Sequence, residues 1–171
     1  LHGIILKQMG SLNESKDKMR ESLLIYKETK GENSLEYAIA LHNISDVYLL
    51  QDSLSLADKY EQASLDIYRI ISDTLSSPYL AIGYKNLGSI RFAQKSYNAS
   101  ERYYNIACNL LESIFGKDNY ELAECLQDLA LCQASAGSYV QALDNLRTSG
   151  NIFRQFLTVN TETMSEHEAQ S

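Results

Sequence analysis

Residues 81–90 read AIGYKNLGSI, in which two apolar or aromatic positions three apart, Tyr84 and Leu87, are followed at once by the small residue Gly88. The same pattern returns 42 residues later in 123–132 (AECLQDLALC) and stands 43 residues earlier in 38–47 (AIALHNISDV). A second small residue follows each pattern at a distance of twelve positions: Ala57, Ser100 and Ala142. A period of this length that recurs several times is typical of a repeat array.

A fourth copy opens the chain and needs no gap. At a displacement of 127 residues, Gly3 aligns with Ala130 and Gly10 with Gly137. Because this copy begins in the middle of its first helix, we expect the sequence to be a fragment of a longer repeat protein. The predicted solenoid covers 1–157, with repeats at about 1–33, 34–76, 77–118 and 119–157. The apolar pattern fades after that, so we expect 158–171 to be a frayed tail or the truncated start of a further repeat.

Every segment between the linkers has helical periodicity, as the apolar stripe of 103–114 illustrates. Turns at 51–53, 94–96 and 136–138 divide each unit into two predicted helices of about fourteen to eighteen residues. Gly31 and Gly116 are expected to end a helix in a left-handed conformation. The predicted N-caps that follow are Asn33 or Ser34, then Ser77, and then Asp118 or Asn119, and Pro78 suits a first helical turn.

These residues resemble the tetratricopeptide repeat, in which apolar–x–x–apolar–small opens the first helix and alanine–x–x–x–aromatic marks the second. The ordinary repeat of that family has ~34 residues, whereas the period here is 42–43. Together with the linker 115–123, the long period resembles the variant found in kinesin light chains and nephrocystin-like proteins. The second unit departs from the pattern, because Tyr60 follows Ala57 by three positions instead of four. A locally shifted second helix is therefore expected there.

The resemblance implies an all-α fold, a right-handed α–α superhelix of antiparallel hairpins. One hairpin cannot bury its apolar face alone, so neighbouring hairpins must stack on one another. The small residues Gly3, Ser45, Gly88 and Ala130 are expected to let the two helices of a unit approach closely. A larger side chain there should overpack the crossing.

The resemblance also implies that the first helix of each hairpin lines a concave groove for a peptide segment of a partner protein. Nine polar residues flank the packing positions and are the predicted groove residues: His42, Asn43, Asp46, Lys85, Asn86, Ser89, Glu124, Gln127 and Asp128. Amides such as those of Asn43 and Asn86 can both donate to and accept from a peptide backbone. An empty, solvated surface would have the same composition, so both interpretations stay open. Phe92 is either an exposed ligand contact or a packing residue.

Composition excludes several classes of partner. The net charge of −7 argues against nucleic acid, whose binding requires clustered Lys and Arg. The sequence shows no membrane-spanning apolar stretch and no signal-peptide pattern, so we expect no membrane insertion. The three cysteines, Cys108, Cys125 and Cys132, form no CxxC pair and are expected as small core residues. These features predict a cytoplasmic protein, and the kinesin light chain resemblance adds association with the cytoskeleton as an alternative.

No constellation for catalysis is apparent, and we predict that the chain is not an enzyme and needs neither a cofactor nor a metal. The three histidines, His2, His42 and His167, are scattered and lack metal-ligand spacing. The carboxylates Asp52 and Glu61 are expected on solvated faces. Three functions then remain: an adaptor that binds a partner's peptide in the groove, a structural subunit that packs by its ends or convex face in a motor or ciliary assembly, or a regulatory module of an enzyme. The oligomeric state stays open.

Overall fold

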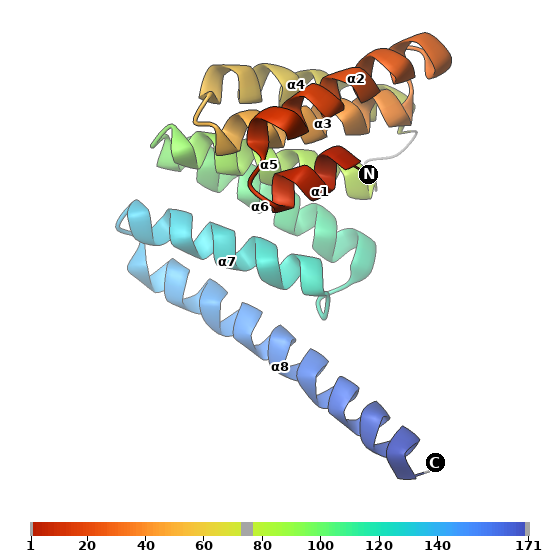
Figure 1. Ribbon diagram of the computed structural model, residues 1–171. Coiled ribbons are helices and arrows are strands. Elements are labelled where there is room, and N and C mark those ends of the chain that lie inside the picture. The colour runs from red at the N-terminus through yellow and green to blue at the C-terminus, as the bar shows by residue number, and fades with distance from the viewer. Residues whose placement is uncertain (1, 73–76, 170–171) are drawn as a thin grey trace.

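The computed structural model describes residues 2–72 and 77–169, and for His2, Leu157 and 159–169 it describes the backbone only. The predicted linker residues 73–76 therefore lie outside the described part. Within that part there are eight helices and no strands, which pair as antiparallel hairpins (Figure 1): α1 (His2–Gln8) with α2 (Leu12–Lys30), α3 (Leu35–Leu50) with α4 (Leu54–Ile71), α5 (Pro78–Ala93) with α6 (Tyr97–Phe115), and α7 (Tyr120–Ser135) with α8 (Tyr139–Ala169). We number these hairpins 1 to 4.

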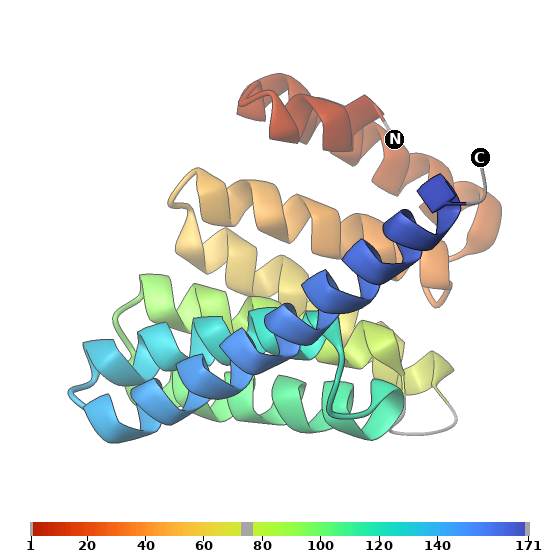
Figure 2. The same ribbon diagram turned by 90° about the horizontal axis from the view of Figure 1, so that it is seen from below.

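The hairpins stack in chain order, as Figures 1 and 2 both show. Each helix packs against the next one along the chain, and the first helices also touch across hairpins, α3 with α5 and α5 with α7. Two hydrophobic clusters run through the stack, one from α2 to α5 and one from α5 to α8. The predicted all-α solenoid is thus confirmed.

The turns inside the hairpins fall where the sequence predicted them, and they share one backbone feature. Four residues at equivalent positions have a positive φ: Gly10 (80°), Asp52 (56°), Lys95 (59°) and Gly137 (86°). Residues with a Cβ atom adopt this left-handed conformation at a cost in free energy, whereas glycine has no such cost. Aspartate tolerates it better than lysine does. The helices before the turns therefore end at Gln8, Leu50, Ala93 and Ser135.

The linkers between hairpins follow the predicted chemistry, with one difference. Gly31 and Gly116 have the expected positive φ, but their ψ values of 163° and 179° lie in an extended region that is essentially restricted to glycine, not in the left-handed helical region. Of the alternative N-caps, Ser34 and Asn119 occupy the position, and each side chain accepts a hydrogen bond from a backbone N–H three residues on. Pro78 begins α5, where its missing N–H leaves no bond unmade.

The two helices of a hairpin cross at the small residues, and buried serine hydroxyls join them there. Ser15 donates to the Gly3 carbonyl at 2.7 Å, Ser45 to Ala57 at 2.8 Å and Ser100 to Gly88 at 2.8 Å. At a second crossing, nearer the start of the first helix, a serine hydroxyl also joins the two helices of hairpins 2 and 4. Ser64 donates to the Ala38 carbonyl at 2.8 Å, and Ser149 donates to the Ala123 carbonyl at 2.7 Å. Small size was predicted at Gly3, Ser45, Gly88 and Ser100, but neither the hydroxyl bridges nor the second crossing was predicted.

The fourth hairpin is unequal, because α8 continues as one helix to Ala169 while α7 ends at Ser135. Figures 1 and 2 show the C-terminal part of α8 projecting past the N-terminal end of the antiparallel α7. Its backbone is helical through 158–169, and residues 170–171 lie outside the described part. The division of the chain at 157, and a further repeat after it, stay predictions.

Candidate functional site

The predicted groove residues lie on the first helices of hairpins 2 to 4: His42, Asn43 and Asp46 on α3, Lys85, Asn86 and Ser89 on α5, and Glu124, Gln127 and Asp128 on α7. We call the exposed side of α1, α3, α5 and α7 the first-helix face. Eight of the nine residues are half-buried or exposed, with Gln127 the exposed one, and Asn86 is buried. The structure therefore leaves eight of them accessible on the first helices, whereas Asn86 is buried.

Ion pairs link neighbouring first helices across this face. Lys7 of α1 lies 2.8 Å from Asp46 of α3. Lys85 of α5 lies between two carboxylates of α7, 3.5 Å from Glu124 and 3.6 Å from Asp128. Half-exposed pairs of this kind contribute little free energy, but they fix where the charges stand. Lys7 was not among the predicted residues, because α1 was read only as a partial helix.

Asn86 is not available to a ligand. Its side chain is 8% exposed, and its Nδ2 donates to Glu61 Oε2 at 2.5 Å and to Ser45 Oγ at 3.4 Å. Its predicted role in binding a peptide backbone has no support in this geometry, since the amide already donates its hydrogen bonds to the buried groups Glu61 and Ser45. Asn43, the equivalent residue one unit earlier, remains half-buried.

The prediction that Glu61 lies on a solvated face is wrong, since its side chain is fully buried between hairpins 2 and 3. His42 Nδ1 lies 3.0 and 3.1 Å from the two carboxylate oxygens. A buried carboxylate requires such partners, because its desolvation is otherwise costly. Asp52, by contrast, is exposed as predicted.

Glu61 also explains the irregular second unit. It lies four residues after Ala57, so it occupies the position that Met19 and Tyr104 hold in hairpins 1 and 3. Helix α4 runs without a break from Leu54 to Ile71, so the expected shift of this helix is not observed. The spacing from Ala57 places Glu61 at a packing position, whereas its charge alone predicts exposure to solvent.

The pKa of His42 is raised by this arrangement. Burial acts to lower it, but the hydrogen bond and charge of Glu61, together with the charge of Asp46, outweigh the burial. The neighbouring carboxylates therefore favour the protonated ring more than water does around a free histidine. His42 Nε2 lies 4.0 Å from Asp46 Oδ2, so the ring stands between the buried Glu61 and Asp46 of the first-helix face.

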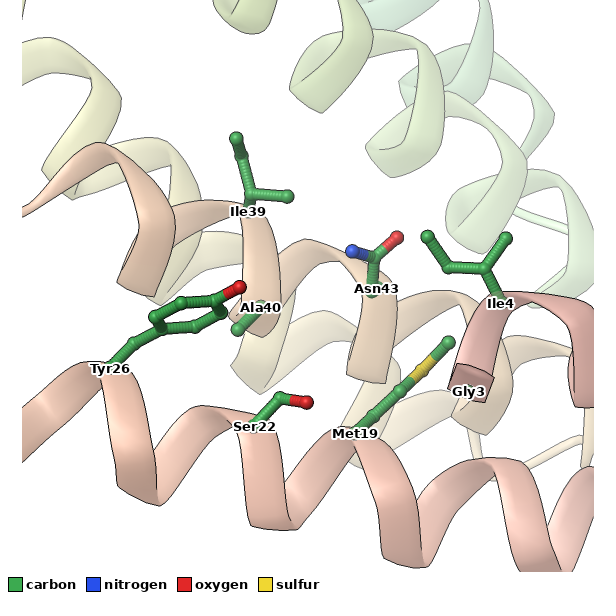
Figure 3. A pocket seen from close by; sticks show the side chains of 8 residues that line it. All are labelled: Gly3, Ile4, Met19, Ser22, Tyr26, Ile39, Ala40 and Asn43. Carbon is green, nitrogen blue, oxygen red and sulfur yellow. The ribbon is translucent and has the colours of Figure 1, made fainter. Parts of the chain in front are cut away.

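Asn43 lines a pocket of about 140 Å³ at the first junction, between α1, α2 and α3 (Figure 3). Its other polar lining groups are Ser22 and Tyr26 of α2. At the equivalent place in hairpin 2, the first half of α3 covers α4, and Ser64 donates to the Ala38 carbonyl. Helix α1 begins at His2 and has no such half among the described residues. We assign this pocket no ligand.

The remaining predicted residues contribute to packing. Ser89 Oγ lies 3.0 Å from Tyr104 Oη and 3.2 Å from the Lys85 carbonyl. Phe92 packs against Tyr97, with ring centroids 5.6 Å apart, which favours the packing interpretation over the ligand contact.

The three cysteines are buried, and Cys108 Sγ lies 2.9 Å from Cys125 Sγ across the third junction. The hydrogen bond with Cys108 and burial both raise the pKa of Cys125, and burial raises that of Cys132. Raised values keep both thiols protonated, which lowers their nucleophilicity. Among the described residues, no three His, Cys, Asp or Glu side chains gather as metal ligands, and no helix has the length and apolarity to cross a bilayer.

Comparisons with known proteins agree with this architecture. A sequence profile described as tetratricopeptide repeat matches residues 1–70 and 79–155. Clustered mitochondria protein homologs from Aspergillus fumigatus and Neosartorya fischeri are each 26% identical over 153 residues, which is 87% of this chain. The chain spans only 11% of the length of these curated relatives.

Solved structures share the fold. The crystal structure of BtubC (BKLC) from P. vanneervenii has a TM-score of 0.80 at 17% identity and covers 90% of this chain and 61% of that one. A putative kinesin light chain from Podosopora anserina, with nearly identical TPR-like repeats, has a TM-score of 0.69 at 11% identity and covers 90% of this chain and 72% of that one. At these identities the likeness concerns the fold alone.

Proposed function

The chain belongs to the tetratricopeptide repeat family, and we propose that it is a non-catalytic adaptor that binds a peptide segment of a partner protein along its first-helix face. The predicted tetratricopeptide repeat family is confirmed by the profile match, and the fold is shared with a putative kinesin light chain. Repeats of this family generally mediate protein–protein interaction, and the fold is typically a non-catalytic scaffold. The peptide, its place in the groove and a cytoplasmic location are our proposals for this chain.

The observation that carries the proposal is the row of ion pairs across the first-helix face. Lys7–Asp46 and Lys85 with Glu124 and Asp128 hold charged groups at fixed places on adjacent helices. Groups ordered before binding lose less conformational entropy when a ligand arrives, which favours recognition. Asn43 and Gln127 add polar groups that are not fully buried on α3 and α7. No cofactor or nucleic acid is needed for this role.

Affinity capture with two sets of variants tests which face binds. The first set changes the first-helix face with Asn43→Ala, Lys85→Gln and Gln127→Ala, in which Gln is the residue that hairpin 4 has at the position of Lys85. The control set reverses the exposed charges of Lys59 and Arg102, which hold equivalent positions on α4 and α6. We expect the first set to lose the partners that the control set retains. The opposite pattern would assign binding to the second helices.

A second function, packing by one end of the stack, is favoured by the exposed face of α8. Leu146 is 49% exposed, whereas Tyr104 and Met19 at the equivalent positions are each 4% exposed under the next first helix. Tyr139, Val140 and Leu143 extend this apolar face. Exposed apolar patches often mark interaction sites. The first helix of a further hairpin, in this protein or in a partner, is the occupant we propose for it.

Leu146→Asp separates this function from groove binding. The side chain is half exposed, so we expect the free energy of unfolding of the isolated chain to change by less than about 0.5 kcal/mol. If the end packs in an assembly, sedimentation should show that the variant no longer associates while peptide capture persists. Unchanged association would remove the end-packing function.

A further inference from the structure

A second pocket, with a volume of about 310 Å³, lies where α5, α6 and α7 meet, between hairpins 3 and 4. Its walls are apolar and include Ile82, Leu111 and Phe115. Phe115 is 48% exposed and Ile82 is 43% exposed, so both side chains can be reached from solvent. Glu121 and Glu124 of α7 stand at its rim. We call this pocket the α5–α7 slot.

The repeat itself shows what fits such a place. At the preceding junction, Tyr79 of α5 stacks on Tyr68 of α4, with ring centroids 5.3 Å apart and planes 24° apart. The equivalent positions at the α5–α7 slot are Glu121 and Leu111. No aromatic ring therefore extends from α7 over α6 at this point, and the space that Tyr79 fills one unit earlier is open.

The rim of the slot is negative. Helix α7 has acidic residues at 121, 124 and 128 and no Lys, Arg or His. Lys85 lies within 3.6 Å of both Glu124 and Asp128, so one ammonium serves two carboxylates, and Glu121 is exposed beside them. Burial and the charge of Glu124 raise the pKa of Asp128 against the opposing effect of Lys85. Additional positive charge would be favourable here.

We propose that the α5–α7 slot receives an aromatic or large aliphatic side chain of the partner's segment, with a Lys or Arg of the same segment beside it on Glu121 and Glu124. The apolar group takes the place that Tyr79 has at the preceding junction. The basic group adds positive charge beside the α7 carboxylates, which the single ammonium of Lys85 does not fully neutralise. This inference rests on the proposed function, since it names the kind of segment that the first-helix face binds.

Selection of peptides from a random twelve-residue phage-displayed library, with the whole chain as the target, tests the proposal. We expect the selected peptides to carry a large apolar residue within two positions of a Lys or Arg. Their binding, measured as synthetic peptides by fluorescence anisotropy, should weaken with added salt, because the rim contact is electrostatic.

Two variants change the slot with residues that the array already uses, one by filling its space and one by making its apolar wall polar. Glu121→Tyr restores the ring that Tyr79 provides one unit earlier, and Ile82→Glu introduces the residue that α7 has at the equivalent position. Glu36→Tyr is the matched control, because Glu36 is the same repeat position on α3. We expect at least tenfold weaker binding to Glu121→Tyr and Ile82→Glu, and unchanged binding to Glu36→Tyr. Circular dichroism verifies that each variant is folded, and either slot variant is sufficient for the test.

The outcomes separate this inference from the proposed function. Selected peptides that bind the two slot variants as well as the original chain would overturn the slot and leave the first-helix face in place. Peptides with apolar residues flanked by Asp or Glu would overturn the charge argument. A library that yields no binding peptide would contradict both proposals.

Discussion

Single side chains decide how closely the helices of this array approach. A Cβ added at Gly88 would lie 2.8 Å from the Tyr104 ring, which is closer than real Cβ contacts allow. The residue types at the crossings could be predicted from the sequence, because small residues recur at fixed spacing. The serine bridges and the Glu61–His42–Asn86 cluster could not, since they depend on which side chains the folded chain places within hydrogen-bond distance.

Gly88→Ala should destabilise the chain by about 1–3 kcal/mol, because the added methyl group overpacks the crossing with Tyr104. Gly150→Ala is the control, since nothing lies within 4 Å of its added Cβ in α8. Alanine there should stabilise the chain by about 0.5–1 kcal/mol through its better helix propensity. Urea unfolding monitored by circular dichroism measures both values. Equal effects of the two substitutions would refute the close approach at Gly88.

His42 should make stability depend on pH. Its pKa in the folded chain is raised above 6.5, so its contribution is complete below about pH 6.5 and is lost as pH rises through the folded pKa. The charged groups that face it are Glu61, Asp46 and Lys7. We expect the free energy of unfolding to fall more steeply between pH 6 and pH 9 for the original chain than for His42→Gln or Glu61→Gln. Parallel curves for all three proteins would show that the protonation of His42 is not coupled to folding.

Helix ends and turns are predictable from the sequence where one residue type controls the backbone. The turns, Pro78 and the positive φ of Gly31 and Gly116 were all predicted. Lys95 and Asp52 show why turn geometry could not be read completely from sequence. They adopt the same left-handed turn as Gly10 and Gly137, because the packed helices on either side hold them there.

Lys95→Gly should therefore stabilise the α5–α6 turn. Relief of the left-handed conformation contributes about 1–2 kcal/mol, and the greater freedom of glycine in the unfolded chain offsets about 0.4–1 kcal/mol of that. A smaller gain is expected for Asp52→Gly, since aspartate tolerates this conformation better. Lys95→Ala keeps a Cβ and should give no gain, which distinguishes conformation from loss of charge. Thermal unfolding of the three variants provides the comparison.

At the scale of the whole molecule, stacking of equivalent hairpins explains both the fold and the candidate sites. Each junction uses the same positions with different residues: Met19 at the first, Glu61 at the second and Tyr104 at the third. The fold tolerates these exchanges because each hairpin contacts only its neighbours. The exchanges in turn give each junction its own chemistry, from the Glu61–His42 pair to the open α5–α7 slot.

Hydrogen–deuterium exchange of the chain, alone and with a captured partner, tests the central claim that the first helices bind the partner. We expect slower amide exchange in α3, α5 and α7 on binding, with little change in α4 or in α6 outside the slot residues Leu111 and Phe115. Protection confined to α4, α6 or α8 would contradict the account and assign recognition to the opposite face or to the end of the stack.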